Sequence, residues 1–577
     1  MKKYIVLFIL LLIATSCARV GSPEGGIKDS IPPTFTGSNI DSTRINVPVD
    51  TKSLRLDFDE YITLKEVQKN LIISPPIKTK RILPSMLGNR YVLIEWEGDL
   101  QENTTYNFNF GNAIADLNES NILPYFNFAF STGEKLDEMY ISGVVTDAMK
   151  RPLDSLSFES PKDNNFVVGL YQEKDTIEYS QKPYYIAKAD PDGYFELNYL
   201  SPGKYRILAY DDENQNMVYD IGKESVAFEK EPIDLTESIS GKPIKLYPSR
   251  KPIRLVESKE STGGFTVLFE GNPDSVTIAA THEKLTDYKV THRKKSDSAQ
   301  VWFDAKELDL GVNQSENIRL AYNADGKTGE SSLFYRLNPE NELTLNNAKG
   351  NLIPPGTFFE ILSNYPIESL NTQQWKLIED SVNTIPLVAE ISPLNNKKIL
   401  IKSPLVKEKK YSLTIPRNSV TSYYISNEKA YQFNFEMDIP ENYGTFVLTI
   451  NNQPEKPFWI QFLDSSEKVV IERLTTAEVN EFASISPGKY SLRILVDNNE
   501  NGFWDQADFL SLMPAEDVYV FPKEIEIRPL WENRESWNLV NNSTALELQQ
   551  TVSTDSQIDE EVKQSSVVLE SNSKIEK

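Results

Sequence analysis

The sequence of 577 residues contains a single cysteine and only two histidines. One cysteine excludes an intramolecular disulfide and any zinc site built from several thiolates. The histidines, His282 and His292, are ten residues apart, a spacing that matches no usual zinc motif. We therefore expect both on the surface or at a strand edge, and any histidine-based catalysis would have to use this one short segment.

Basic residues are also scarce. Lys and Arg number 60 against 84 Asp and Glu, which gives a net charge of -24 and makes general nucleic-acid binding unfavourable. The chain has no Gly-rich phosphate loop leading into a helix and no Gly-x-Ser-x-Gly motif. Two carboxylates close in space, as a glycosidase needs, arise by chance among so many acidic residues. We expect a protein that is not an enzyme, with a glycoside-active enzyme as the remote alternative.

Long apolar runs are absent except near residue 1. Three residues with two lysines precede the apolar run Tyr4–Ile13, and small residues then lead to Cys17. Ten apolar residues are too few to span a membrane, which takes about 20, whereas this order is typical of a secretory signal. Cys17 resembles the acylated cysteine of a bacterial lipobox, with Ala14 in the place of the usual Leu. That resemblance implies a signal peptide over 1–16 and attachment of Cys17 to a lipid leaflet.

Sequence patterns typical of β-strands are abundant in the chain. Apolar residues alternate with polar ones in Leu54–Phe58, Tyr91–Trp96 and Tyr106–Phe110, so that one face of each strand can meet a core. The 27 Tyr and 27 Phe supply the apolar surface for packed cores. Short strands separated by Asn, Gly and Pro clusters favour β-sandwiches, and the length implies several of them. We expect an elongated, all-β tandem array.

Two modules resemble known families. Pro23, Gly25-Gly26, Lys28-Asp29 and Pro32-Pro33 behind Cys17, with the closing strand Phe126–Ser131, resemble Bacteroidota outer-membrane lipoproteins that carry a bacterial Ig-like domain, first named from surface-layer proteins. Ile141–Asp147, Asp192–Phe195 and Ser201–Tyr205 are similar to the transthyretin-like sandwich of carboxypeptidase regulatory domains. The resemblance implies a cell-envelope location, and it implies no active site.

Both modules recur. Leu405 and Tyr411 repeat the spacing of Leu100 and Tyr106, and the segment Ser486–Tyr490 repeats the sequence Ser-Pro-Gly-Lys-Tyr. The predicted organisation is therefore a signal peptide (1–16), a flexible tether (17–33), an Ig-like domain (34–135), a transthyretin-like domain (137–250), an unassigned β-sandwich (251–345), a second Ig-like domain (346–438), a second transthyretin-like domain (440–540) and an acidic tail (541–577). The tail has no aromatic residue, Gly or Pro, so we expect it to be disordered.

One segment has the spacing of a calcium loop. Oxygen side chains stand at positions 1, 3, 5, 9 and 12 of residues 497–508, Gly502 is at position 6, and the Phe503 carbonyl is at position 7. The predicted structural Ca²⁺ ligands are Asp497, Asn499, Asn501, Phe503, Asp505 and Asp508. Asp508 replaces the usual Glu, as in dockerin loops. The alternative is an Asn-rich turn whose side chains cap their own backbone.

A second, weaker candidate loop follows the first Ser-Pro-Gly-Lys-Tyr segment. Its oxygen side chains come from Asp212, Asn214, Asn216 and Asp220. Met217 takes the glycine position and Lys223 stands at the twelfth, where a positive charge would oppose a cation.

Taken together, the sequence predicts a lipid-anchored binding or scaffolding protein of the cell envelope. Its partners would be the outer-membrane lipid leaflet and other envelope proteins or glycans, and no cofactor is required beyond the candidate Ca²⁺. One version is an accessory subunit of an outer-membrane secretion or assembly machine, and the alternative is a surface adhesin or glycan-binding protein. A shallow trough of exposed Trp and Tyr would favour the adhesin. Which face of the membrane it occupies stays open.

Overall fold

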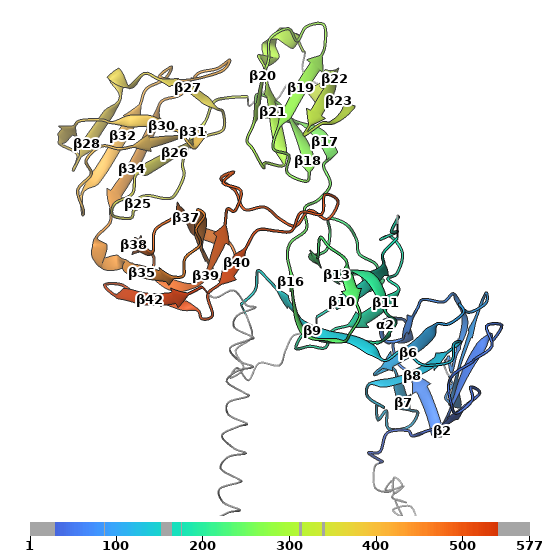
Figure 1. Cartoon of the computed structure of the whole chain (residues 1–577). Coiled ribbons are helices and arrows are strands. Elements are labelled where there is room, and N and C mark those ends of the chain that lie inside the picture. The colour runs from blue at the N-terminus through green and yellow to red at the C-terminus, as the bar shows by residue number, and fades with distance from the viewer. Residues whose placement is uncertain are drawn as a thin grey trace, which may run out of the picture.

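The computed structural model describes residues 29–85, 87–151, 164–174, 176–310, 314–336 and 341–539. Cys17, the signal peptide, most of the tether and the acidic tail lie outside these residues. The described strands form five β-sandwich modules, and the one α-helix among them is the single turn α2 (Val67–Asn70) (Figure 1). The predicted all-β tandem fold is confirmed. Within the described ranges, no helix is long and apolar enough to cross a membrane.

Module 1 packs a five-stranded sheet against a three-stranded one. The larger sheet has the order β1-β2-β5-β4 with β7 on β2, and the smaller has the order β3-β6-β8. Leu54, Leu56 and Phe58 point into the core from one face of β2, as the alternation predicts. The bounds are β1 (Phe35–Ser38), β2 (Ser53–Leu64), β3 (Ile72–Ser74), β4 (Thr79–Leu83), β5 (Asn89–Trp96), β6 (Thr105–Gly111), β7 (Ile114–Asp116) and β8 (Phe126–Ser131).

Module 2 also has two sheets, with orders β11-β10-β13-β14, plus β15 on β13, and β12-β9-β16. Its last strand, β16, pairs parallel with its first strand, β9. The bounds are β9 (Met139–Asp147), β10 (Phe166–Gln172), β11 (Tyr185–Lys188), β12 (Tyr194–Leu200), β13 (Gly203–Asp211), β14 (Val226–Phe228), β15 (Ile233–Leu235) and β16 (Ile239–Leu246).

Module 5 repeats this topology strand for strand. Its sheets have the orders β37-β36-β39-β40, plus β41 on β39, and β38-β35-β42, with β42 parallel to β35. The two Ser-Pro-Gly-Lys-Tyr turns make the same contact, since Tyr205 donates to the Ser201 carbonyl (3.0 Å) and Tyr490 to that of Ser486 (2.9 Å). The bounds are β35 (Gly444–Asn451), β36 (Phe458–Leu463), β37 (Val469–Thr475), β38 (Val479–Ile485), β39 (Gly488–Val496), β40 (Val518–Val520), β41 (Ile525–Ile527) and β42 (Glu532–Asn538).

Module 3 pairs the sheet β17-β18-β21-β20 with the sheet β19-β22-β23. Its core joins side chains from both sheets, including Phe265, Val301, Ile318 and Leu333. The bounds are β17 (Arg254–Ser261), β18 (Gly264–Glu270), β19 (Val276–Thr281), β20 (Lys289–His292), β21 (Ser298–Trp302), β22 (Ser315–Ala324) and β23 (Lys327–Arg336), with a 3₁₀ turn at Ala305–Leu308.

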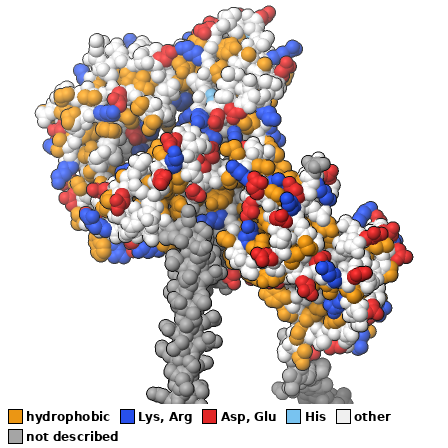
Figure 2. All heavy atoms as spheres, in the orientation of Figure 1, with side chains coloured by type: hydrophobic (Ala, Val, Ile, Leu, Met, Phe, Trp, Pro, Cys, Tyr) orange, Lys and Arg blue, Asp and Glu red, His pale blue; other side chains and the backbone are white. Residues whose placement is uncertain are grey.

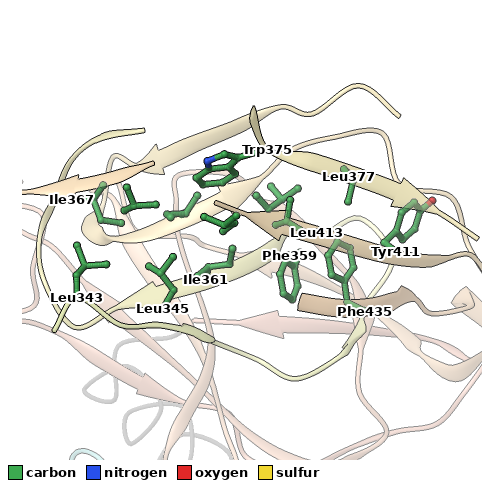
Figure 3. Close-up of a cluster of buried hydrophobic side chains, with 14 of the residues drawn as sticks. Leu343, Leu345, Phe359, Ile361, Ile367, Trp375, Leu377, Tyr411, Leu413 and Phe435 are labelled. Atoms are coloured by element: carbon green, nitrogen blue, oxygen red, sulfur yellow. The ribbon is translucent and has the colours of Figure 1, made fainter. Parts of the chain in front are cut away.

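Module 4 has the sheets β24-β26-β31-β30 and β25-β34-β32-β28-β29, with the pair β27-β33 at one end. Figure 3 shows its core side chains, which include Phe359, Leu413 and Phe435, filling the space between the strands. The bounds are β24 (Leu345–Asn347), β25 (Leu352–Ile353), β26 (Phe359–Ser363), β27 (Ile367–Leu370), β28 (Lys376–Glu379), β29 (Asn383–Ile385), β30 (Ala389–Ser392), β31 (Asn395–Ile401), β32 (Lys410–Ile415), β33 (Val420–Ser422) and β34 (Tyr431–Met437).

The spacing of Leu100 and Tyr106 in module 1 and that of Leu405 and Tyr411 in module 4 have the same structural cause. The Tyr106 hydroxyl accepts a hydrogen bond from the backbone N–H of Gln101 (2.8 Å), and the Tyr411 hydroxyl accepts one from Val406 (2.7 Å). Each tyrosine is buried and fixes the corner that leads into its own strand, β6 or β32. The repeated Leu and Tyr landmarks therefore mark the same local structure in both modules.

The modules do not form a straight line. Residues 506–515 of module 5 return to the junction between modules 2 and 3, where Ala507 pairs with Ser249 and bonds to Arg250 and Pro248. Phe509 is inserted into module 2 beside Tyr219. Figure 1 shows this orange-red segment reaching across to the green modules. The elongated array predicted from sequence is folded back on itself, because this loop buries an aromatic ring in another module.

Candidate functional site

The two Asn-rich segments occupy equivalent places in modules 2 and 5, directly after β13 and β39. We call them loop A (residues 212–224) and loop B (residues 497–516). Each begins with an aspartate that is almost fully buried, Asp212 (3% exposed) and Asp497 (1% exposed). Their carboxylates accept the backbone N–H groups four and five residues on, at 3.0 and 2.9 Å in loop A and at 2.9 and 2.8 Å in loop B. The loops thus share one backbone fold.

Loop A adopts this fold despite Met217 at the glycine position. Met217 has a φ of 61°, in the left-handed region where its counterpart Gly502 has 85°. The Met217 side chain is 5% exposed and packs with Val167 and Tyr210 in an apolar cluster, which offsets the strain of that backbone conformation. Met217 is therefore compatible with the backbone fold of the loop, although its place at the glycine position counted against loop A in the sequence analysis.

The asparagines bond within their own loops. Asn214 accepts the N–H of Asn216 (3.1 Å), and Asn499 accepts that of Asn501 (3.0 Å). The amide groups of Asn499 and Asn501 donate to Asp505 Oδ2 at 2.8 and 2.6 Å. Asn214 likewise donates to Asp220, and Asn216 accepts the N–H of Val218 (2.6 Å). Phe503 donates its N–H to Asn501 Oδ1 (2.8 Å). The backbone capping that sequence offered as an alternative is present in both loops.

A buried glutamate in each loop was missed by the sequence analysis. Glu224 (2% exposed) accepts the N–H of Asp220 at 2.9 Å, and Glu516 (6% exposed) accepts that of Asp505 at 2.8 Å. Glu516 also accepts the N–H of Asn499 (3.1 Å). Each glutamate stands two residues before the next strand, β14 or β40, in the pattern Glu-x-Val. Aligning the two modules on those strands would have revealed the pair.

The residues predicted at the twelfth position lie elsewhere. Lys223 is exposed, so it does not oppose a cation within loop A. Asp508 faces Ser511 and the guanidinium of Arg250, which is 3.7 Å away. Counting twelve residues fails because the inward acidic side chain comes at position 13 in loop A and only after an insertion in loop B.

Three carboxyl groups of the loops, those of Glu224, Glu516 and Asp505, have displaced pKa values. Burial, with further repulsion from Asp212 and Asp220, raises the pKa of Glu224 to about 7. Burial also raises the pKa of Glu516, although backbone N–H groups act against it. For Asp505, burial favours a higher pKa, but hydrogen bonds from Lys295 and Asn499 outweigh it and lower the pKa. Neighbouring negative charge thus disfavours the charged form of Glu224 in loop A, whereas Lys295 stabilises the charged form of Asp505 in loop B.

A lysine side chain of module 3 forms an ion pair with loop B. Lys295 Nζ lies 2.6 Å from Asp505 Oδ1, and Lys294 Nζ is 3.5 Å from the Asn501 carbonyl oxygen and above the Phe503 ring. Sequence analysis did not foresee this contact, because about 200 residues separate its partners and no local pattern signals it. Loop B is therefore part of an interface between modules.

The histidines are held separately from these loops. His292 bonds through its two ring nitrogens to the carbonyls of Ser298 and Pro273, at 3.2 and 3.1 Å. His282 lies 3.5 Å from Glu316. Throughout the part of the chain that the structure describes, no three His, Cys, Asp or Glu side chains converge as they stand on a point that could hold a metal ion.

A cleft of about 430 Å³ lies where modules 2 and 5 meet. Its walls include β14, the half-buried Lys245, Ala515 and Asp517. Burial lowers the pKa of Lys245. Elsewhere on the face seen in Figure 2, Lys and Arg side chains are interspersed with Asp and Glu.

The comparisons with known proteins bear on module 1. Residues 29–132 match a bacterial Ig-like domain. No curated protein is similar to the chain. Among solved structures, the surface-layer protein SbsC (domains 1–6) is 10% identical, with 86% of this chain and 67% of that chain covered and a TM-score of 0.16. The BSP domain of a biofilm-associated protein is 10% identical, with 87% and 99% covered and a TM-score of 0.15. A Bacteroides ovatus protein, SGBP-B of a mixed-linkage glucan utilization locus, is 11% identical, with 64% and 90% covered and a TM-score of 0.18. At these identities and TM-scores, the matches carry no conclusion about this chain.

Proposed function

We propose that this chain is a non-catalytic scaffold of the bacterial cell envelope, held in the outer-membrane lipid leaflet by an acylated Cys17. The supporting observation is the bracing of its modules. Phe509 of module 5 is buried in module 2, and Trp302 of module 3 is buried in the core cluster of module 4. Such contacts fix the relative positions of β-sandwiches whose short linkers alone would leave them free to move.

The distribution of exposed aromatic residues favours a scaffold over a glycan-binding adhesin. Tyr125 (78% exposed) lies in module 1, Phe334 (70%) in module 3 and Trp531 (59%) in module 5. Sugar-binding surfaces need several aromatic rings side by side, whereas these three most exposed rings lie in separate modules; Tyr140 and Tyr194 of module 2 are less exposed. Partners of a scaffold are other envelope proteins, which would bind at exposed strand edges and loops.

Substituting Cys17 by serine tests the anchor. We expect the natural chain to incorporate labelled palmitate and to sediment with the outer membrane, while the Cys17→Ser chain takes up no label and appears in the soluble fraction. The reason is that a serine hydroxyl does not replace the thiol that lipoprotein acylation requires, and the described modules have no spanning helix.

Ser16→Ala is the matched control, because it keeps a small residue before Cys17 and should leave labelling unchanged. Sedimentation of the Cys17→Ser chain with the membrane would contradict lipid anchoring. Binding of the purified chain to a panel of envelope polysaccharides, with no protein cross-linked to it in intact membranes, would favour the adhesin in place of the scaffold.

A further inference from the structure

Two buried polar atoms, one in loop A and one on the preceding strand β13, have no hydrogen-bond partner among the described residues. Glu224 Oε1 and the Tyr210 hydroxyl are both without a hydrogen-bond partner, and they are two of only five such side-chain atoms among the described residues. The N–H of Glu213 acts on the Glu224 carboxylate and lowers its pKa, but its hydrogen bond is directed to the Asp211 carbonyl at 2.8 Å. An ionisable oxygen left unpaired inside a protein is destabilising, so its retention points to a ligand.

Two further carboxylates, Asp212 and Asp220, lie near Glu224, although the three do not converge on one point as they stand. Asp212 and Asp220 are close enough to Glu224 that both disfavour its charged form. Among the described residues, Asp220 and Glu224 form no ion pair with Lys or Arg; Lys69 and Lys188 line a small cavity of about 10 Å³ on the Asp212 side, and Lys188 makes an interaction of its own. Loop B differs, because Lys295 lies on Asp505, the counterpart of Asp220.

We propose that loop A is a Ca²⁺ site in which Glu224 completes the ligand set of Asp212, Asn214, Asn216 and Asp220. Ca²⁺ takes six to eight oxygen ligands from carboxylates, amides and carbonyls, and it tolerates irregular geometry. Four side chains at positions 1, 3, 5 and 9, a carbonyl at position 7 and one or two oxygens of Glu224 reach that number. In loop B, the Lys295 ammonium pairs with Asp505 instead.

Ion binding requires side chains to rotate, because the carboxylates of Asp212, Asp220 and Glu224 do not converge on one point as they stand. Asn214 now turns its amide nitrogen to Asp220, and rotation of that amide group presents its oxygen instead. Asp212 holds the loop closed through the N–H groups of Asn216 and Met217. The site also has a structural consequence, since Tyr219 within the loop packs edge-on against Phe509 at 5.1 Å.

The test is calcium titration calorimetry on the chelator-treated full chain carrying Cys17→Ser, which removes the lipid and so makes the result independent of the anchor. We expect one Ca²⁺ per chain and a rise in the midpoint of thermal unfolding. Glu224→Gln, which can still accept the Asp220 N–H, should lower the affinity by at least about tenfold, because it removes a carboxylate ligand. Mg²⁺ should bind more weakly.

Two controls separate the site from its surroundings. Lys223→Gln changes the adjacent exposed residue and should leave calcium binding intact, as should Glu516→Gln in loop B. Circular dichroism in the presence of chelator should show that the Glu224→Gln chain is folded. Absence of heat with the unsubstituted chain, equal affinity after Glu224→Gln, or loss of the signal only after Glu516→Gln would each overturn the proposal.

Discussion

Replacing Phe509 by alanine is expected to release module 5 from module 2. Phe509 lies on a loop yet is only 6% exposed, and its ring meets Tyr179, Tyr219 and Phe228 at centroid distances of 4.8, 5.1 and 5.4 Å in edge-to-face geometry. Removing a buried phenylalanine ring costs about 3–5 kcal/mol. Because tenfold in an equilibrium corresponds to about 1.4 kcal/mol, the docked population should fall by roughly two to three orders of magnitude relative to the undocked one.

This prediction is measured by small-angle scattering and limited proteolysis. We expect a larger radius of gyration and rapid cleavage between residues 506 and 515, while the core of module 5 stays folded because Phe509 is not part of it. Leu510→Ala is the matched control, since Leu510 is 64% exposed and its truncation should change neither quantity. An unchanged scattering curve for Phe509→Ala would show that the ring does not hold the two modules together.

Replacing Trp302 by alanine should uncouple modules 3 and 4. Trp302 is on β21 of module 3, but it is 1% exposed and belongs to the core cluster of module 4, where its ring lies 5.4 Å from Tyr365. The indole N–H donates to Thr291 (2.7 Å). The truncation removes a large buried surface from both modules at once, so we expect a loss of about 3–5 kcal/mol in the free energy of unfolding.

Differential scanning calorimetry distinguishes this effect from simple destabilisation. Modules 3 and 4 should unfold in a shared transition in the natural chain and in separate transitions after Trp302→Ala. Trp531→Ala provides the control, because Trp531 is 59% exposed and its loss should leave the transitions in place. A single transition that merely moves to lower temperature would contradict the coupling.

Much of the fold could be predicted because short, local sequence patterns determine the strands and corners. The alternation in Leu54–Phe58 shows which face of β2 meets the core, and the Tyr106 and Tyr411 spacings mark equivalent corners. The folded-back arrangement could not be predicted in this way. Phe509 stands in an ordinary loop segment, and its partners Tyr179, Tyr219 and Phe228 are about 280 to 330 residues away, beyond the reach of any periodicity.

In the candidate site too, residues that act locally were predicted and residues that act over a long sequence distance were missed. Asp212 and Asp497 were found from spacing, because an aspartate that caps its own loop acts over only five residues. Glu224 was missed, since a fixed twelve-residue count assigned the last position to Lys223. Lys295 was missed because it reaches loop B from another module. The ranking of the loops changes accordingly, and loop A becomes the better candidate for a metal ion.

The parallel pairing of the first and last strands gives modules 2 and 5 a mechanical property. In module 5, β35 and β42 are matched over seven residue pairs. Tension applied at the start of β35 and the end of β42 pulls the two strands past each other along their length, so all the hydrogen bonds between them resist together and none can be peeled away singly. If the protein were stretched between a membrane and a partner, modules 2 and 5 would be the last to unfold.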